Sequence, residues 1–448
     1  MKFNDFLHGL RFGDIPEPVI ERTRYLLLDL IGVAAAGTTT DMSRIIRDHA
    51  AGMFGPGSRR TRLMFDGRAV SPAGAALAGG ISIDSMDGHD GHKLTKGHAG
   101  CGVLPSVLAY FDAEGLSDER EFLTQMAIGY EVATRAGIAL HRTACDYHTS
   151  GAWVAIAAAA LGARTLGLGE AATREAIGIA EYHGPRSQMM RCIDYPTMVK
   201  DGSGWGAMAG VSAAYLAASG FTGAPAITVE APDVADLWGD LGSTWRVMEQ
   251  YIKCFPVCRW AQPPLQAVLN LRAAHGLSSD QVERIEVETF HQSVRLACRS
   301  PKTTEEAQYS TSFPTAAGMV RGRVGTEEVS EAAFSDPEIL RLSEGMVFTE
   351  RDDFNAAFPA RRLAEVTLVL KDGRRLASGV TEARGDPEAP LPAEEMVEKY
   401  RGLAEPVLGA ERSGRLEAAV LGLGISSGAD RGVASLLSDV FEPLLEGD

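Results

Sequence analysis

The chain has 448 residues and a formal net charge of −16, with 45% hydrophobic and 23% charged residues. This length predicts two or three domains with a large core, and the acidic charge argues against nucleic acid and anionic membrane surfaces as partners. The six cysteines include no CxxC pair, the N-terminus lacks a long apolar stretch, and no apolar run is long enough to span a membrane. We therefore expect a soluble cytoplasmic protein with reduced thiols.

Helical patterns dominate the chain from residue 17 to about residue 250. Apolar residues recur at three- and four-residue spacing, or small residues predominate, in six segments: 16–37, 71–85, 101–115, 118–140, 149–168 and 205–220. The Ala- and Gly-rich segments among them permit close packing with burial on nearly all sides. This composition predicts a central helical bundle.

The pattern changes after residue 280. Residues 281–290 alternate charged and apolar side chains, which is typical of a half-buried strand. Residues 361–387 contain two strand-like runs joined at Asp372-Gly373, a strong hairpin turn signal. A Pro-rich acidic stretch, residues 385–395, is a candidate linker at the end of this unit.

Helical patterns return in residues 393–407 and 411–426. We therefore predict a mainly α fold with one large all-helical domain and one inserted, smaller α/β domain. The helical domain comprises residues 1–255 and 392–448, and the α/β domain comprises residues 256–391.

The segment of residues 84–105 has no apolar period and concentrates titratable groups. It contains three histidines and three aspartates: Asp84, Asp87, His89, Asp90, His92 and His98. Imidazole and carboxylate groups together supply acid–base chemistry near neutral pH, and we favour Asp87 and His98 as the working pair. A metal site is the alternative, with His89 and His92 joined by Asp87, Asp90 or His98, although this spacing matches no familiar zinc signature.

Two later segments place a titratable residue at a predicted helix start. His148 precedes a helix that Thr149 or Ser150 is expected to cap, and the backbone amides there favour anions and lower the pKa of a nearby imidazole. Lys200 precedes a Gly-rich turn and an Ala-rich helix, a combination that suits an anion. The spacing matches neither a Walker A loop nor a GxGxxG motif, so nucleotide binding is not predicted.

Lys253 and Arg259 flank an apolar segment with a proline, and they supply the local cations that an acidic protein needs to bind a carboxylate. Cys254 and Cys258 lie between them without an adjacent base, and we interpret them as buried, unreactive thiols. If residues 301–318 are helical, Tyr309 and Phe313 share one face and pack in the core.

Five segments, in this order, resemble the MmgE/PrpD family: DSMDGHDGHKLTKGHAGCGVLP, YHTSG, YPTMVKDGSGWGAMAG, KCFPVCRW and EEAQYSTSFPTAAG. Members of this family include 2-methylcitrate dehydratase, cis-aconitate decarboxylase and iminodisuccinate epimerase. The resemblance implies a helical domain with a smaller α/β lid, a homodimer, a site in the cleft between the domains, and catalysis without metal or organic cofactor. It places the family's site pattern on five residues, with one residue inserted before the second: Asp87, His98, His148, Lys200 and Lys253.

The chain departs from the decarboxylase type of this pattern at two positions. Gly91 stands where that type has Thr, and Phe313 stands where it has Tyr. Both departures remove hydroxyl groups from the expected pocket, and a pocket built around such hydroxyls leaves their partners unpaired. The departures, together with His89 and His92, argue against cis-aconitate as the substrate.

We predict a cofactor-independent lyase that acts on a small di- or tricarboxylate by removing a proton next to a carboxylate, most simply a hydro-lyase like 2-methylcitrate dehydratase. Catalytic roles are assigned to Asp87, His98 and His148, and substrate-binding roles to Lys200, Lys253, Arg259, His89 and His92. The alternatives are an isomerase or epimerase, a decarboxylase, a non-catalytic carboxylate-binding relative and a metal-dependent hydrolase.

Overall fold

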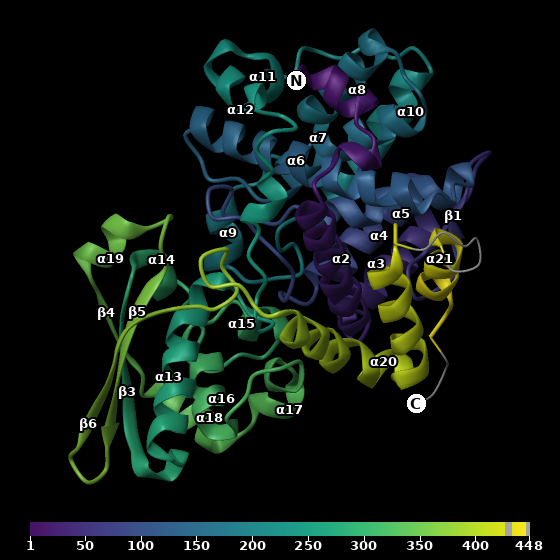
Figure 1. Ribbon diagram of the computed structural model, residues 1–448. Coiled ribbons are helices and arrows are strands. Elements are labelled where there is room, and N and C mark those ends of the chain that lie inside the picture. The colour runs from purple at the N-terminus through teal and green to yellow at the C-terminus, as the bar shows by residue number, and fades with distance from the viewer. Residues whose placement is uncertain (426–431, 445–448) are drawn as a thin grey trace.

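The computed structural model describes residues 1–425 and 432–444. Most of the chain is helical, as predicted, and the strands gather in one region (Figure 1). The helices of the first part are α1 (Phe3–Gly9), α2 (Glu17–Gly37), α3 (Asp41–Met53), α4 (Pro72–Asp84), α5 (Gly100–Glu114), α6 (Glu119–Thr143), α7 (Gly151–Thr165), α8 (Glu170–His183), α9 (Met189–Asp194), α10 (Ser203–Ala218), α11 (Ile227–Glu230) and α12 (Ala235–Gly239). Two short strands, β1 (Thr61–Arg62) and β2 (Ala69–Val70), pair between α3 and α4.

Helices α4, α5, α7 and α10 form the centre of the helical body (Figure 1). Their small residues allow the close packing that the composition predicts. A Cβ added at Gly206 or Gly210 of α10 would collide with the backbone of α7, and one at Gly80 of α4 would collide with the backbone of α10. The loop of residues 85–99 is held against this centre, because α4 ends just before it and α5 begins just after it.

A four-stranded sheet occupies the other end of the molecule in Figure 1, where its strand order is β4-β3-β5-β6. The strands are β3 (Val282–Thr289), β4 (Val347–Glu350), β5 (Leu363–Leu370) and β6 (Arg375–Glu382). The predicted strand over 281–290 and the predicted hairpin are confirmed, with Gly373 at a φ of 90° in the turn. Strand β4 pairs parallel with β3, and the sequence analysis did not identify it.

Short helices surround the sheet and contribute to the site. They are α13 (Gln262–His275), α14 (His291–Val294), α15 (Thr304–Gln308), α16 (Ser312–Arg321), α17 (Glu331–Phe334), α18 (Pro337–Glu344) and α19 (Asp352–Ala357). The expectation that Tyr309 and Phe313 share one helix face is wrong, because α15 ends before Tyr309 and α16 starts after it. Phe313 packs edge-on against Phe334 in the core, whereas Tyr309 faces the pocket described below.

After the sheet the chain returns to the helical body. Helix α20 (Ala393–Gly422) packs along α2, and α21 (Val433–Phe441) packs on α20. The two predicted helices of this part are joined across a kink at Gly409, whose φ of 75° is not helical. Residues 426–431 and 445–448 of the predicted C-terminal part lie outside the described residues, and the domain limits at 255/256 and 391/392 stay predictions. Among the helices of the described part, none is long and apolar enough to cross a membrane.

Candidate active site

The polar loop between α4 and α5 is buried, although its composition is that of a surface loop. Asp87, His89, Asp90 and His98 are all buried. Backbone pairing fixes the loop, because Gly91 bridges to Tyr251 and residue 92 to residue 97. Buried carboxylates and imidazoles need partners, so the contacts of each group determine its protonation state.

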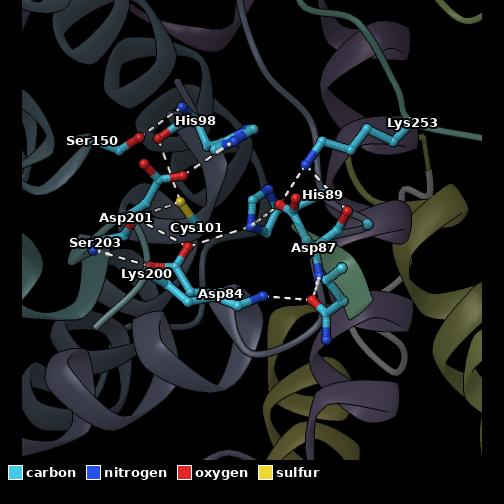
Figure 2. A network of polar contacts seen from close by, with 12 residues as sticks. Asp84, Asp87, His89, His98, Cys101, Ser150, Lys200, Asp201, Ser203 and Lys253 are labelled. Atoms are coloured by element: carbon cyan, nitrogen blue, oxygen red, sulfur yellow. Dashed lines mark hydrogen bonds and ion pairs between the residues drawn. The ribbon is translucent and has the colours of Figure 1, made fainter. Parts of the chain in front are cut away.

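Asp87 forms an ion pair with Lys253, whose Nζ donates to Asp87 Oδ1 at 2.5 Å (Figure 2). The backbone N–H of Asp87 donates to Gln308 Oε1 at 2.8 Å. Burial alone would raise the pKa of Asp87, but attraction to Lys253 and then Lys200 holds it well below the usual range. Burial would likewise lower the pKa of Lys253, but Asp87 raises it. The pair is therefore fully charged at neutral pH.

Both ring nitrogens of His98 have defined surroundings. Its Nδ1–H donates to the Asp90 carbonyl oxygen, and its backbone N–H donates to Ser150 Oγ at 2.9 Å. Its Nε2 lies 3.3 Å from Asp201 Oδ2 (Figure 2). Because a carbonyl oxygen only accepts, the proton of the neutral ring is on Nδ1 and Nε2 carries the lone pair.

Burial, followed by repulsion from Lys253 and His89, lowers the pKa of His98 well below its usual value. Burial, followed by repulsion from Asp84 and Asp87, raises the pKa of Asp201 to about 8. At neutral pH this acid–base pair therefore consists of a neutral imidazole and a protonated carboxyl group. An imidazole kept neutral in this way is able to accept a proton.

His89 lies between the Asp87–Lys253 pair and the His98–Asp201 pair (Figure 2). Its Nε2 is 3.3 Å from Asp84 Oδ1 and 3.8 Å from Asp87 Oδ1, and its ring centroid is 4.2 Å from that of His98. Asp84 in turn accepts from the backbone N–H of Ser203 at 3.1 Å, at the start of α10. The helix start that was predicted to bind an anion is thus occupied by the protein's own Asp84.

Lys200 points away from that helix start. Its φ of 40° is in the left-handed region, and its Nζ donates to Gln308 Oε1 at 2.5 Å while lying 5.1 Å from the Tyr309 ring. Gln308 therefore joins Lys200 to the backbone of Asp87. Lys253 contacts the Asp87 carboxylate directly, whereas Lys200 acts on it electrostatically without an ion-pair contact.

Asp87, His98 and Tyr309 line a small cavity of about 20 Å³. Its lining residues are Asp87, Lys96, His98, Tyr147, Met189, Ile193, Tyr251, Cys258, Arg259, Trp260, Tyr309 and Arg362. The loop, α9, the segment before α13 and the residue before β5 all contribute to this wall. A cavity of this size has room for about one water molecule.

Tyr251 is placed in this cavity by a glycine. A Cβ added at Gly91 would collide with the Tyr251 hydroxyl and lie 2.8 Å from His98 Nδ1. The guanidinium groups of Arg259 and Arg362 lie over the Tyr251 ring, at 4.7 and 5.4 Å from its centroid. Gly91, which was interpreted as the loss of a hydroxyl, therefore makes room for a hydroxyl from another segment.

Five of the predicted site residues are not among those that line this cavity: His89, His92, His148, Lys200 and Lys253. The first, fourth and fifth of these lie near Asp87 as described above, whereas His92 and His148 make other contacts. His92 is buried, and its Nε2 is 2.8 Å from Glu249 Oε2. His148 lies before α7, where its Nδ1–H donates to the Asp146 carbonyl oxygen at 3.0 Å. Its neighbour Thr149 lines a separate cavity of about 460 Å³, which Lys200 also reaches.

The predicted cap of α7 is wrong in detail. Ser150 occupies the N-cap position, but its hydroxyl makes no capping bond. That hydroxyl instead accepts from the backbone N–H of His98, as described above. The start of α7 thus positions the acid–base loop instead of stabilising its own first turn.

Two groups within the described residues have the composition of metal ligands. They are Asp84, His89 and Cys101, and Asp87, His89 and His98, with ligand atoms within 4.8 Å of one another in each group. The pairing of His89 with His92 is not among them. Lys253 already binds Asp87, and an ammonium group at that carboxylate competes with a cation.

Several residues of the site were not predicted from the sequence: Lys96, Tyr147, Tyr251 and Arg362, which line the cavity, and Asp201, which lies beside His98. Three of them adjoin a residue that was predicted, since Asp201 follows Lys200, Tyr147 precedes His148, and Tyr251 is two residues before Lys253. In an extended segment residues two apart face the same side, which is a signal that could have identified Tyr251. Arg362 carries no such signal.

The comparisons with known proteins agree with the segments quoted above. Residues 1–237 match the MmgE/PrpD N-terminal domain, and residues 255–424 match the MmgE/PrpD C-terminal domain. Similar proteins include cis-aconitate decarboxylase of Aspergillus terreus, which is 24% identical over 93% of this chain and 91% of its own. Human cis-aconitate decarboxylase is 25% identical over 91% of this chain and 88% of its own, and the mouse enzyme is 24% identical over 91% and 86%.

Proposed function

The chain belongs to the MmgE/PrpD family, and we propose that it is a lyase that removes a proton next to a carboxylate group of a small di- or tricarboxylate. The observation that carries this proposal is the neutral His98, held beside the protonated Asp201 and facing a cavity that Asp87, the ion-pair partner of Lys253, also lines. A base and fixed cations around one small cavity are what this chemistry requires.

His98 is the proposed base. With Nδ1–H donated to the Asp90 carbonyl, Nε2 is the nitrogen that accepts the proton from carbon. The imidazolium that forms carries the positive charge, and an oxygen of the adjacent Asp201 accepts its new Nε2–H. Lys253 and Lys200 stabilise the enolate-like charge that develops on the substrate carboxylate.

Elimination of water is the first choice of reaction, and it needs a second group that protonates the departing hydroxyl. We assign this role to His148; its ring does not line the closed cavity, so the role depends on the change of shape proposed below. Decarboxylation is the second candidate. The similar proteins named above favour it, and the Tyr251 hydroxyl at Gly91 supplies a polar group where the decarboxylase type has Thr.

Substrate entry requires a change of shape. A cavity of about 20 Å³ does not admit a tricarboxylate, and its wall combines Asp87 and His98 from the helical body with Arg362 from the sheet region. We propose that these two parts of the wall separate to admit substrate and close during the reaction, which excludes water from the developing charge.

The experiment that tests this function is proton NMR of the purified chain in D2O with citrate, 2-methylcitrate, cis-aconitate, malate-type acids and N-substituted aspartates. Deuterium next to a carboxylate is the expected result. Dehydration gives a new vinylic product, decarboxylation gives a product one carbon shorter, and epimerisation gives exchange without either. Absence of exchange with every member of the panel would contradict the proposal.

Two further expectations remain proposals and have simple tests. We propose a homodimer, which light scattering of the purified chain checks directly. We also propose that no metal is needed. About one tightly bound zinc per chain in elemental analysis would favour the metal-dependent alternative at Asp87, His89 and His98.

A further inference from the structure

The cations around the pocket fall into two groups. Three of them have partners: Lys253 is paired with Asp87 at 2.5 Å, Arg259 with Asp386 at 2.8 Å, and Lys200 donates to Gln308. Two of them, Lys96 and Arg362, have no ion pair and no side-chain hydrogen bond within the described residues. The second group is the unexpected one, because a cation withdrawn from water without an anion is costly, and Arg362 is buried while Lys96 is half-buried.

Arg362 shows this most clearly. Only 4% of the residue is exposed, and its Nε and Nη1 have no hydrogen-bond partner. Its guanidinium group lies over the aromatic ring of Tyr251. The neighbouring Arg361, in contrast, is exposed and pairs with Glu382 at 2.8 Å. The chain therefore pairs the arginine on the surface and leaves the arginine in the pocket free to bind.

Lys96 faces the same cavity from the helical body. Its backbone φ of 50° is one that residues other than glycine rarely adopt. The Tyr147 hydroxyl donates a hydrogen bond to its backbone carbonyl oxygen. Its Nζ lies 4.5 Å from the centre of the Tyr147 ring. Burial, followed by repulsion from Arg362, lowers the pKa of Lys96. Two cations that repel each other across one cavity are stabilised by an anion between them.

From this arrangement we infer that Arg362 and Lys96 bind a second carboxylate group of the substrate, remote from the carbon that loses its proton. The inference rests on the proposed function and assigns residues to the second carboxylate of its di- or tricarboxylate substrate. One carboxylate lies at Lys253 and Lys200, and the other lies between Lys96 and Arg362. The planar guanidinium of Arg362 matches the two oxygens of a carboxylate.

Tyr251 lies between the two subsites. Its ring supports the guanidinium groups of Arg259 and Arg362, and its hydroxyl reaches the loop at Gly91 beside His98. Binding of the remote carboxylate at Arg362 is therefore coupled through one rigid side chain to the position of the base. Interactions remote from the reacting carbon supply the orientation that proton transfer needs.

The test measures binding of unreactive acids by calorimetry. Acetate, succinate and tricarballylate form a series with one, two and three carboxylates, and inorganic phosphate serves as an unrelated anion. The variants are Arg362→Gln and Lys96→Gln, and Arg361→Gln is the matched surface control. We expect Arg362→Gln to weaken succinate and tricarballylate binding by roughly 30-fold or more, with acetate binding unchanged and no effect of Arg361→Gln.

Thermal melting without ligand separates binding from folding. Because Arg362 is buried without an anion, Arg362→Gln should melt at the same temperature as the wild type or higher. A lower melting temperature would assign Arg362 a structural role and overturn the inference. Lys96→Gln should show the same combination of weaker succinate binding and unchanged melting.

Two further results would contradict the inference of a second carboxylate subsite. If succinate binds Arg362→Gln as tightly as the wild type, or if only phosphate binding depends on Arg362, the inference is wrong. Deuterium exchange by the wild type would leave the proposed function standing in either case. Conversely, Arg362-dependent binding of succinate without exchange of any acid would support the second subsite and contradict the proposed lyase activity.

Discussion

The charged groups in the two halves of the pocket differ in whether they have partners. In the half formed by Asp87, His98, Asp201 and Lys253, Asp87 pairs with the oppositely charged Lys253, and His98 lies beside Asp201, of which only Oδ1 is left without a hydrogen-bond partner in the described part of the chain. In the half formed by Lys96 and Arg362, the cations have no anion within the described residues. We refer to these as the paired half and the unpaired half.

The contrast separates two tasks that a lyase must perform. Proton transfer requires groups whose protonation states are fixed before substrate arrives, and only a network of partners fixes them. Recognition of the remote carboxylate, in contrast, benefits from cations that have no anion before substrate arrives, which describes Lys96 and Arg362. Substitutions should therefore destabilise the fold in the paired half and weaken binding in the unpaired half.

The largest effect is expected from Lys253→Met. It leaves the buried Asp87 carboxylate without its ammonium partner and should lower the free energy of unfolding by about 3–5 kcal/mol. Urea denaturation measures this loss. The double variant Lys253→Met, Asp87→Leu should recover most of the stability without any activity, because it removes both charges together.

A stability loss below about 1 kcal/mol in Lys253→Met would mean that the pair is no stronger than an exposed salt bridge. The paired half would then not be held together by charge, and its contrast with the unpaired half would disappear.

The next largest effect is expected on the rate of deuterium exchange. His98→Asn should reduce deuterium exchange by about 10²–10⁴-fold, the usual contribution of a positioned base. His92→Asn is the matched control, since His92 is also a buried histidine but bonds to Glu249 outside the cavity, and its exchange rate should stay close to that of the wild type. His148→Ala tests the proposed proton donor, and full turnover in this variant would exclude that role.

A smaller effect is expected where the two halves meet. Gly91→Ala should destabilise the chain by about 1–3 kcal/mol, because the new methyl group collides with the Tyr251 hydroxyl. Adding Tyr251→Phe should restore part of this stability, and a double-mutant cycle measures the coupling. Strictly additive effects would show that the hydroxyl is not held beside Gly91.

Much of the helical body could be predicted from periodicity and small-residue composition, because a stripe of Ala and Gly has few uses other than close packing. The strands over 281–290 and 361–387 were equally visible, since alternation and the Asp372-Gly373 turn are local signals. Strand β4 was missed because it pairs at the edge of the sheet with a segment far away in the sequence, and local pattern does not encode that pairing.

The site residues likewise separate into those with a local sequence signal and those without one. Asp87, His98 and Lys253 could be predicted because they stand in polar segments that no regular element explains, and the family resemblance marked the same residues. Asp201 and Arg362 could not, because their importance depends on what faces them. An arginine before a strand is an ordinary surface residue until the fold buries it without an anion.

The smallest effect concerns the protonation state on which the paired half depends. The pKa of Asp201 is about 8 in the folded chain, against an ordinary value of 3.8. Between these values the folded chain keeps a proton that the unfolded chain has released, so this group makes the wild type less stable as pH rises from about 4 to 8. Asp201→Asn lacks the titration, and its melting temperature relative to the wild type should rise by roughly 1–3 °C from pH 5 to pH 8.

Asp240→Asn provides the opposite case for this measurement. Burial would raise the pKa of Asp240, but its hydrogen bond from Arg135 holds it below the usual value, so Asp240 is ionised at both pH 5 and pH 8. Its substitution should therefore cost the same stability at both pH values. If Asp201→Asn behaves in the same way, Asp201 is ionised at neutral pH and His98 is then the protonated member of the pair. The paired half would in that case start the reaction with an acid instead of a base, and protonation of the substrate would be its first step.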